Sequence, residues 1–173
     1  MKNTTIRPIT LFFFLFLSTL YGFSQEIIKE KWPNGRLKST GTLLNGKEDG
    51  LWTYYYENGQ KEREGTFLEG KRHDKWSEWY ENGKLWTEQY FKMDLPEGYA
   101  AEYDMNGQKV EEGTFKEGKP AGLFNSWFNT GQPKSSGEKY GETLEGHWIY
   151  YHENGNKDSE GDFKQGKRAG QFR

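Results

Sequence analysis

The sequence predicts an all-β protein, in which tandem stacked β-hairpin repeats form an elongated, twisted, single-layer antiparallel sheet. Three observations predict this fold. An Asn-Gly pair recurs every 24 residues, glycine occurs 22 times, and aromatic residues make up 17% of the chain although hydrophobic residues reach only 32%. No apolar stripe with the 3.6-residue period of a helix appears. A thin sheet covered by flat rings fits this composition better than a thick aliphatic core does.

The repeat is marked by its glycines. The Asn-Gly pairs are Asn34-Gly35, Asn58-Gly59, Asn82-Gly83, Asn106-Gly107 and Asn154-Gly155, with Thr130-Gly131 in the remaining position. In most units an aromatic residue such as Trp52 precedes this pair, and a second glycine such as Gly65 follows it. A fixed period of this length is typical of repeat architectures. It defines about six hairpin units over residues 25–173.

A single unit can be derived from its local sequence. Residues 52–56 are strong β-formers, and residues 61–68 form the returning strand. We expect Asn58-Gly59 to form a two-residue hairpin turn, because both positions tolerate positive φ. One hairpin alone is marginally stable, so the units must stack on one another.

A two-residue turn would also fix the cross-strand partners. It would pair Trp52 with Gly65 and Tyr56 with Lys61. A large ring lying over a glycine compensates for the missing side chain, which would explain why the two positions recur together. A longer turn would shift these pairs.

Alternation along each strand divides the side chains between two faces. The face that carries Trp52 collects most of the rings, and we assign it to structural packing. The other face carries one aromatic residue per repeat, and these residues form a candidate ligand-binding ladder: Tyr55, Trp79, Tyr103, Trp127 and Tyr151. Equivalent positions two strands apart are roughly 10 Å apart, so the five rings would form a row along the array.

The N-terminus has the pattern of a signal peptide over residues 1–24. Lys2 and Arg7 supply positive charge, residues 9–21 are apolar, and cleavage is expected before Gln25. The apolar stretch is shorter than the ~20 residues needed to span a bilayer. We therefore expect an exported protein that is periplasmic, bound to the cell envelope or secreted.

Composition excludes several classes of function. The chain has no cysteine, which removes disulfides, thiolate metal sites, a cysteine nucleophile and a lipidated N-terminal cysteine. Removing residues 1–24 would leave 22 basic and 26 acidic residues, a net charge of about −4. This balance disfavours nucleic acid and weakens the case for anionic lipid, although peripheral membrane association stays open.

No catalytic, metal or cofactor site is expected. His147 and His152 are five residues apart on one predicted strand, so they would point to opposite faces and could not share a metal ion. Acids such as Glu62 and Glu64 would need a cleft to act as a glycosidase pair, and a flat sheet offers none. Their simpler interpretation is a solvated, charged edge. We therefore expect no enzyme and no cofactor.

The repeat is irregular in its middle. Gln89 replaces the glycine, residues 92–96 replace the usual turn, and Ala100 replaces the aromatic residue. These changes allow two interpretations, a patch that contacts a partner or ordinary drift in a tolerant segment. We favour drift, because loops tolerate change.

These motifs resemble the MORN-repeat variant family over roughly residues 27–173. The resemblance is carried by Gly50-Leu51-Trp52, Tyr55-Tyr56-Glu57-Asn58-Gly59, Gly65-Thr66-Phe67 and Gly70-Lys71, and again by Gly146-His147-Trp148, Tyr150-Tyr151, Asn154-Gly155 and Gly161-Asp162-Phe163. It implies an elongated sheet of hairpins with no catalytic residues. Members are often described as YwqK-type antitoxins, and related MORN proteins as membrane-associated or protein-binding scaffolds. Choline-binding repeats of bacterial cell-wall proteins show a weaker likeness.

Three functions follow as hypotheses. The first is a non-catalytic exported scaffold, monomeric, that mediates protein–protein interaction in the cell envelope or outside the cell. The second is a glycan or cell-wall binding module that uses the aromatic ladder. The third, by analogy with the family alone, is an antitoxin or immunity protein.

Overall fold

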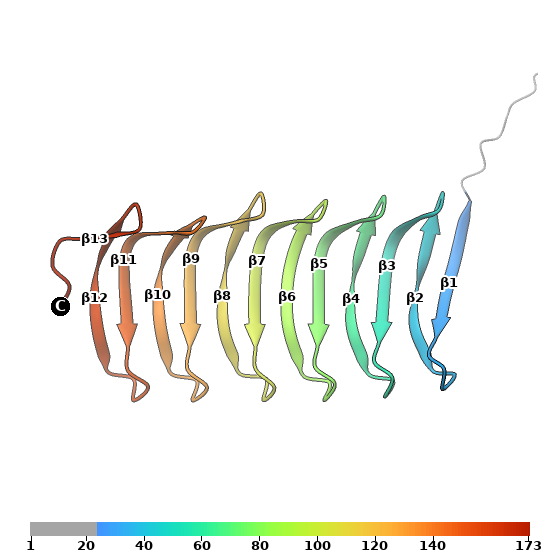
Figure 1. Ribbon diagram of the computed structural model, residues 1–173, viewed down its shortest axis with the longest axis horizontal. Coiled ribbons are helices and arrows are strands. Elements are labelled where there is room, and N and C mark those ends of the chain that lie inside the picture. Colours follow the sequence, from blue (N-terminus) through green and yellow to red (C-terminus); the bar gives the residue numbers. More distant parts are fainter. Residues whose placement is uncertain (1–23) are drawn as a thin grey trace, which may run out of the picture.

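The computed structural model describes residues 24–173 as one row of antiparallel strands (Figure 1). The strands are β1 (Gln25–Lys31), β2 (Leu37–Leu44), β3 (Lys47–Tyr55), β4 (Lys61–Leu68), β5 (Lys71–Trp79), β6 (Leu85–Lys92), β7 (Leu95–Tyr103), β8 (Lys109–Lys116), β9 (Lys119–Trp127), β10 (Pro133–Tyr140), β11 (Thr143–Tyr151), β12 (Lys157–Lys164) and β13 (Lys167–Ala169). The predicted signal peptide lies outside the described residues, apart from Ser24.

Every strand in this row pairs with its neighbours in sequence, so the 13-stranded sheet runs in order from β1 to β13. Figure 1 shows a single layer that extends sideways, with turns along both of its long edges. The predicted all-β fold of stacked hairpins is therefore confirmed.

The Asn-Gly turns are longer than predicted. Only the glycine has a positive φ, which is 94° at Gly59, whereas Asn58 does not. The Gly59 amide donates to the Tyr56 carbonyl at 2.9 Å, and the Tyr56 amide donates to the Gln60 carbonyl at 2.9 Å. This is a three-residue loop, a type I turn followed by a left-handed glycine. The Asn58 side chain stabilises it by accepting the Gln60 amide at 2.9 Å.

This loop shifts the register at the end of the hairpin. Lys61 pairs with Tyr55, so the predicted pairing of Lys61 with Tyr56 is wrong. The predicted pair of Trp52 with Gly65 is confirmed, because it lies beyond the shift.

The two-residue turns lie at the opposite edge of the sheet. Glu69 and Gly70, which connect β4 to β5, have φ values of 53° and 80°. Positive φ at both residues defines a type I′ turn, whose twist matches that of the strands. Other turns with two positive φ values are Asn45-Gly46, Met93-Asp94, Glu117-Gly118 and Gln165-Gly166. The irregular residues 92–96 therefore keep the geometry of the other repeats.

The rings cover glycines, but not the ones predicted. Gly65 lies between Trp52 of β3 and Trp76 of β5, and it pairs with both. The ring over Gly65 is that of Trp76, and a methyl group at Gly65 would overlap it. Trp52 instead covers Gly41 of the strand before it. The expectation that Trp52 covers Gly65 is therefore wrong, because each ring leans back toward the preceding strand.

The same arrangement recurs along the array. Phe124 covers Gly113, Trp148 covers Gly137 and Phe172 covers Gly161. Each glycine provides the space for a flat ring, and the ring shields the backbone of the strand on which it lies.

The tryptophans also satisfy the backbone at a register shift. Between β4 and β5 the pairing moves from Gly65–Trp76 to Thr66–His73, which displaces two residues of β5 from the ladder. The Trp76 indole N–H donates to the Thr66 carbonyl at 3.0 Å. Because Asp74 in the displaced segment has a φ of 57°, the strand can bend there.

The small core lies on one face of the sheet, which we call the inner face. Its buried rings are Trp52, Trp76, Phe91, Phe124 and Trp148. Phe67 contacts Trp52 and Trp76 edge-on, with ring centroids 6.2 and 4.8 Å apart. The predicted packing role of this face is confirmed by the burial of these rings. Tyr56 and Tyr80 lie directly after the ends of β3 and β5, beside the turns.

The lean of the rings leads to a prediction. Gly65→Ala should lower the free energy of unfolding by about 1–3 kcal/mol, because the methyl group overlaps the Trp76 ring. In a Trp76→Ala background the same change should be nearly neutral. In a Trp52→Ala background it should remain costly. Urea denaturation of the single and double variants measures the change in the free energy of unfolding in each background. Relief by Trp52→Ala rather than Trp76→Ala would contradict the assignment.

Candidate functional site

The structure brings the five ladder residues to equivalent positions. Tyr55, Trp79, Tyr103, Trp127 and Tyr151 are the last residues of β3, β5, β7, β9 and β11. Each pairs with the first residue of the following strand, and all five side chains are half-exposed. They lie on the face opposite the buried rings, which we call the outer face. The row is placed beside the Asn-Gly turns.

Lysine side chains lie between the rings of the ladder. The Lys61 ammonium is 5.5 Å from the centroid of Trp79. The Lys109 ammonium is 5.8 Å from the Tyr103 centroid and 5.7 Å from the Trp127 centroid, so it bridges two neighbouring rungs. At these distances the ammonium is attracted by the ring electrons.

Glutamates hold these lysines in place. Lys61 bonds Glu64 at 2.7 Å, and Lys109 bonds Glu112 at 2.7 Å. Partial burial would raise the pKa of Glu64, but hydrogen bonds from Lys61 and Thr53 outweigh it and lower the pKa. The hydrogen bond to Glu112, and after it the one to the Tyr99 hydroxyl, raises the pKa of Lys109 above its usual value. The outer face therefore carries aromatic rings together with ion pairs.

Each of the first three rungs is anchored by the preceding repeat. The Trp32 indole donates to the Tyr55 carbonyl at 3.0 Å. The Tyr56 hydroxyl donates to the Trp79 carbonyl at 2.7 Å, and the Tyr80 hydroxyl donates to the Tyr103 carbonyl at 2.9 Å. Sequence reasoning missed these contacts, although the polar aromatic residues that make them are also 24 residues apart.

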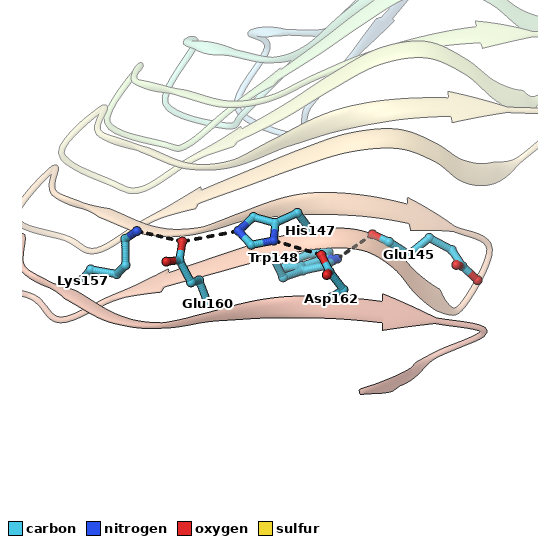
Figure 2. Close-up of polar contacts among 6 residues, drawn as sticks. All are labelled: Glu145, His147, Trp148, Lys157, Glu160 and Asp162. Atoms are coloured by element: carbon cyan, nitrogen blue, oxygen red, sulfur yellow. Dashed lines mark hydrogen bonds and ion pairs between the residues drawn. The ribbon is translucent and has the colours of Figure 1, made fainter. Parts of the chain in front are cut away.

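A charged cluster occupies the outer face near the end of the array (Figure 2). His147 Nδ1 is 3.0 Å from Asp162 Oδ1, and His147 Nε2 is 3.3 Å from Glu160 Oε2. Lys157 bonds Glu160 at 2.7 Å, which completes a row of alternating charges. The hydrogen bonds to Asp162 and then to Glu160 raise the pKa of His147.

One of the other histidines differs from expectation. His152 lies in the turn after β11 rather than on the strand, and its Nε2 is 3.1 Å from Asp158 Oδ1. His73 lies in β5. In residues 24–173 no three His, Cys, Asp or Glu side chains are grouped so as to hold a metal ion. The same part of the chain contains no helix long and apolar enough to cross a membrane.

The family comparison agrees with this geometry. The model of the MORN repeat variant matches residues 48–69, 75–93 and 144–165. Three of the hairpin repeats therefore match the MORN repeat variant. The three matched segments coincide closely with the hairpins β3–β4, β5–β6 and β11–β12. No curated protein matches the chain. Proteins with MORN repeats are generally non-enzymatic and often serve as scaffolds that bind proteins or membranes.

The cluster at His147 gives a pH prediction. The pKa of His147 should lie above the usual ~6.5 of a histidine. Its ion pairs should stabilise the fold fully below the unfolded pKa, and this contribution should be lost as pH rises through the higher folded pKa. Asp162→Asn should lower the pKa, measured by NMR titration of the imidazole. Asp158→Asn, which removes an acid outside the cluster, should leave it unchanged. An unperturbed pKa in the parent protein would contradict the geometry.

Proposed function

We propose that this chain is a non-catalytic, exported repeat scaffold that binds a protein partner through the outer face. One observation carries the proposal. Five half-exposed rings occupy the same position in successive repeats, on the face that the buried rings do not use. Structural packing does not need them there, so their recurrence is better explained by contact with a partner.

The chemistry of this face favours a protein. Besides the aromatic rings and ion pairs of the ladder, the outer face carries exposed apolar side chains at equivalent positions. Leu51 is 61% exposed and Leu123 is 54% exposed. Rings with aliphatic neighbours and a charged surround are the usual anatomy of a protein interface. Because the strands hold the rungs in place, binding would cost little ordering entropy.

A glycan ligand is the second candidate, and the exposed rings favour it. Sugars stack on ring faces that are open to solvent. Here Lys61 lies over Trp79, and Lys109 lies over both Tyr103 and Trp127. A stacked sugar would have to displace these ammonium groups, whereas a protein could pair with them. This contact favours the protein partner. The antitoxin or immunity role rests on analogy alone.

The proposal predicts the effect of removing two rungs. Trp79→Ala with Trp127→Ala should keep the β circular dichroism spectrum, because both side chains are half-exposed. A photo-crosslinking amino acid at Tyr103 should form a discrete protein adduct in cells, and the double variant should abolish that adduct. Trp86→Ala, which removes an exposed tryptophan outside the ladder, is the matched control and should retain it.

Two outcomes would count against the proposal. Unfolding of the double variant would make the ladder structural. Binding of the parent protein to a glycan array, lost in the same variant and without a protein adduct, would favour the glycan alternative.

Export is tested separately. The sequence pattern of residues 1–24 supports cleavage before Gln25. Mass spectrometry of the protein from its native cells should therefore find Gln25 at the N-terminus. An intact Met1 terminus would refute export through a cleaved signal peptide.

A further inference from the structure

The inner face has a hollow where one repeat has lost its ring. Ala100 of β7 occupies the position that is filled elsewhere by Trp52, Trp76, Phe124 and Trp148. Gln89, the cross-strand partner of Ala100, replaces the glycine on which that ring would lie. The space left there is a hollow of about 250 Å³, with Phe115 and Phe124 on its apolar side.

Two carboxylates face each other at this hollow. Glu102 and Glu111 are direct cross-strand partners on β7 and β8, and both are exposed. Like charges directly opposite one another destabilise a sheet. The equivalent pair on β3 and β4 is Tyr54 with Arg63. The β7–β8 hairpin lacks the buried ring at Ala100. It also lacks the cation that Arg63 supplies in the β3–β4 hairpin, and it carries two acids instead.

The same face shows how this protein places a guanidinium group. The Arg63 guanidinium carbon is 4.1 Å from the Tyr54 centroid. The corresponding distance is 4.0 Å for Arg72 over Phe91 and 4.2 Å for Arg168 over Phe172. The planar, weakly hydrated guanidinium group is well suited to stacking on a ring while it pairs with carboxylates.

A cation already approaches one side of the hollow. The Lys139 ammonium is 3.4 Å from Glu111 and 4.8 Å from the Phe124 centroid. Lys139 occupies the position held by Phe67 and Phe115 in other repeats. Its contacts show that the carboxylate and the ring together attract positive charge. Glu102 accepts a hydrogen bond from the Trp86 indole at 3.4 Å, and no cation of residues 24–173 forms an ion pair with it.

We propose that this hollow binds an arginine side chain supplied by a protein partner. The guanidinium group pairs with Glu102 and Glu111 and lies against the ring of Phe124. It takes the place that Arg63 fills against Tyr54 in the β3–β4 hairpin. The hollow shares no residue with the aromatic ladder and lies on the opposite face, so it is a second contact beyond the one proposed above. The change at Gln89 and Ala100 is then a specialisation of the repeat rather than drift.

The test uses small probes and the purified protein. N-acetyl-arginine methylamide, titrated by NMR, should shift the backbone amides of Ala100 and Gly113. The citrulline analogue, which has the same shape without the charge, should bind at least about tenfold more weakly. The lysine analogue should also bind more weakly, because it cannot pair with two carboxylates in one plane.

Three variants examine the parts of the hollow. Glu102→Gln with Glu111→Gln should weaken binding about tenfold or more. Lys139→Gln should strengthen it, because a competing cation is removed. Gln89→Gly with Ala100→Trp rebuilds the ring-on-glycine pair of the other repeats, so it should abolish binding and raise the melting temperature.

The controls separate this site from the ladder. Trp79→Ala with Trp127→Ala should leave the arginine titration unchanged, even where it abolishes the crosslinked adduct. Equal binding of arginine and citrulline analogues would overturn the proposal. So would unchanged binding after both acids are neutralised, or shifts confined to the outer face.

Discussion

The fold depends on a ring that lies over a glycine of the preceding strand. In a single layer no second sheet shields the backbone, so each strand must be covered by side chains from its neighbour. Trp76 does this for Gly65, and its indole N–H also bonds the Thr66 carbonyl at the register shift. One side chain therefore fills the space, covers the backbone and satisfies a polar group. Gly65 is required because any larger side chain would overlap the ring.

The two faces follow from this packing. The inner face takes the buried rings and their edge-on phenylalanine contacts, and it accounts for most of the core. The outer face needs no such cover, and its half-exposed rings are held by lysines and glutamates. Hydrogen bonds such as that of the Tyr56 hydroxyl to the Trp79 carbonyl run from one repeat to the next. Cohesion along the array is thus distributed over many similar junctions.

The fold was largely predictable from the sequence, because the 24-residue period fixes both the strand order and the position of each ladder residue. The turns were not. Asn58-Gly59 is the usual signal for a two-residue turn, but here the asparagine side chain bonds the Gln60 amide and supports a longer loop. The real two-residue turns use residues such as Glu69, which carries no clear signal for positive φ. Which glycine a ring covers depends on the lean of the side chain, which periodicity does not specify.

The order of the strands also determines how the array can change. Each strand pairs only with its sequence neighbours, so stability is close to a sum of local terms. A compact globular core would transmit the loss of a central tryptophan to every layer packed on it. Here the vacancy at Ala100 is confined to one junction, while the repeats on either side keep their rings. The side chains of one unit can therefore change while its neighbours maintain the fold. A repeat sheet permits this independence between units, whereas a single globular core does not.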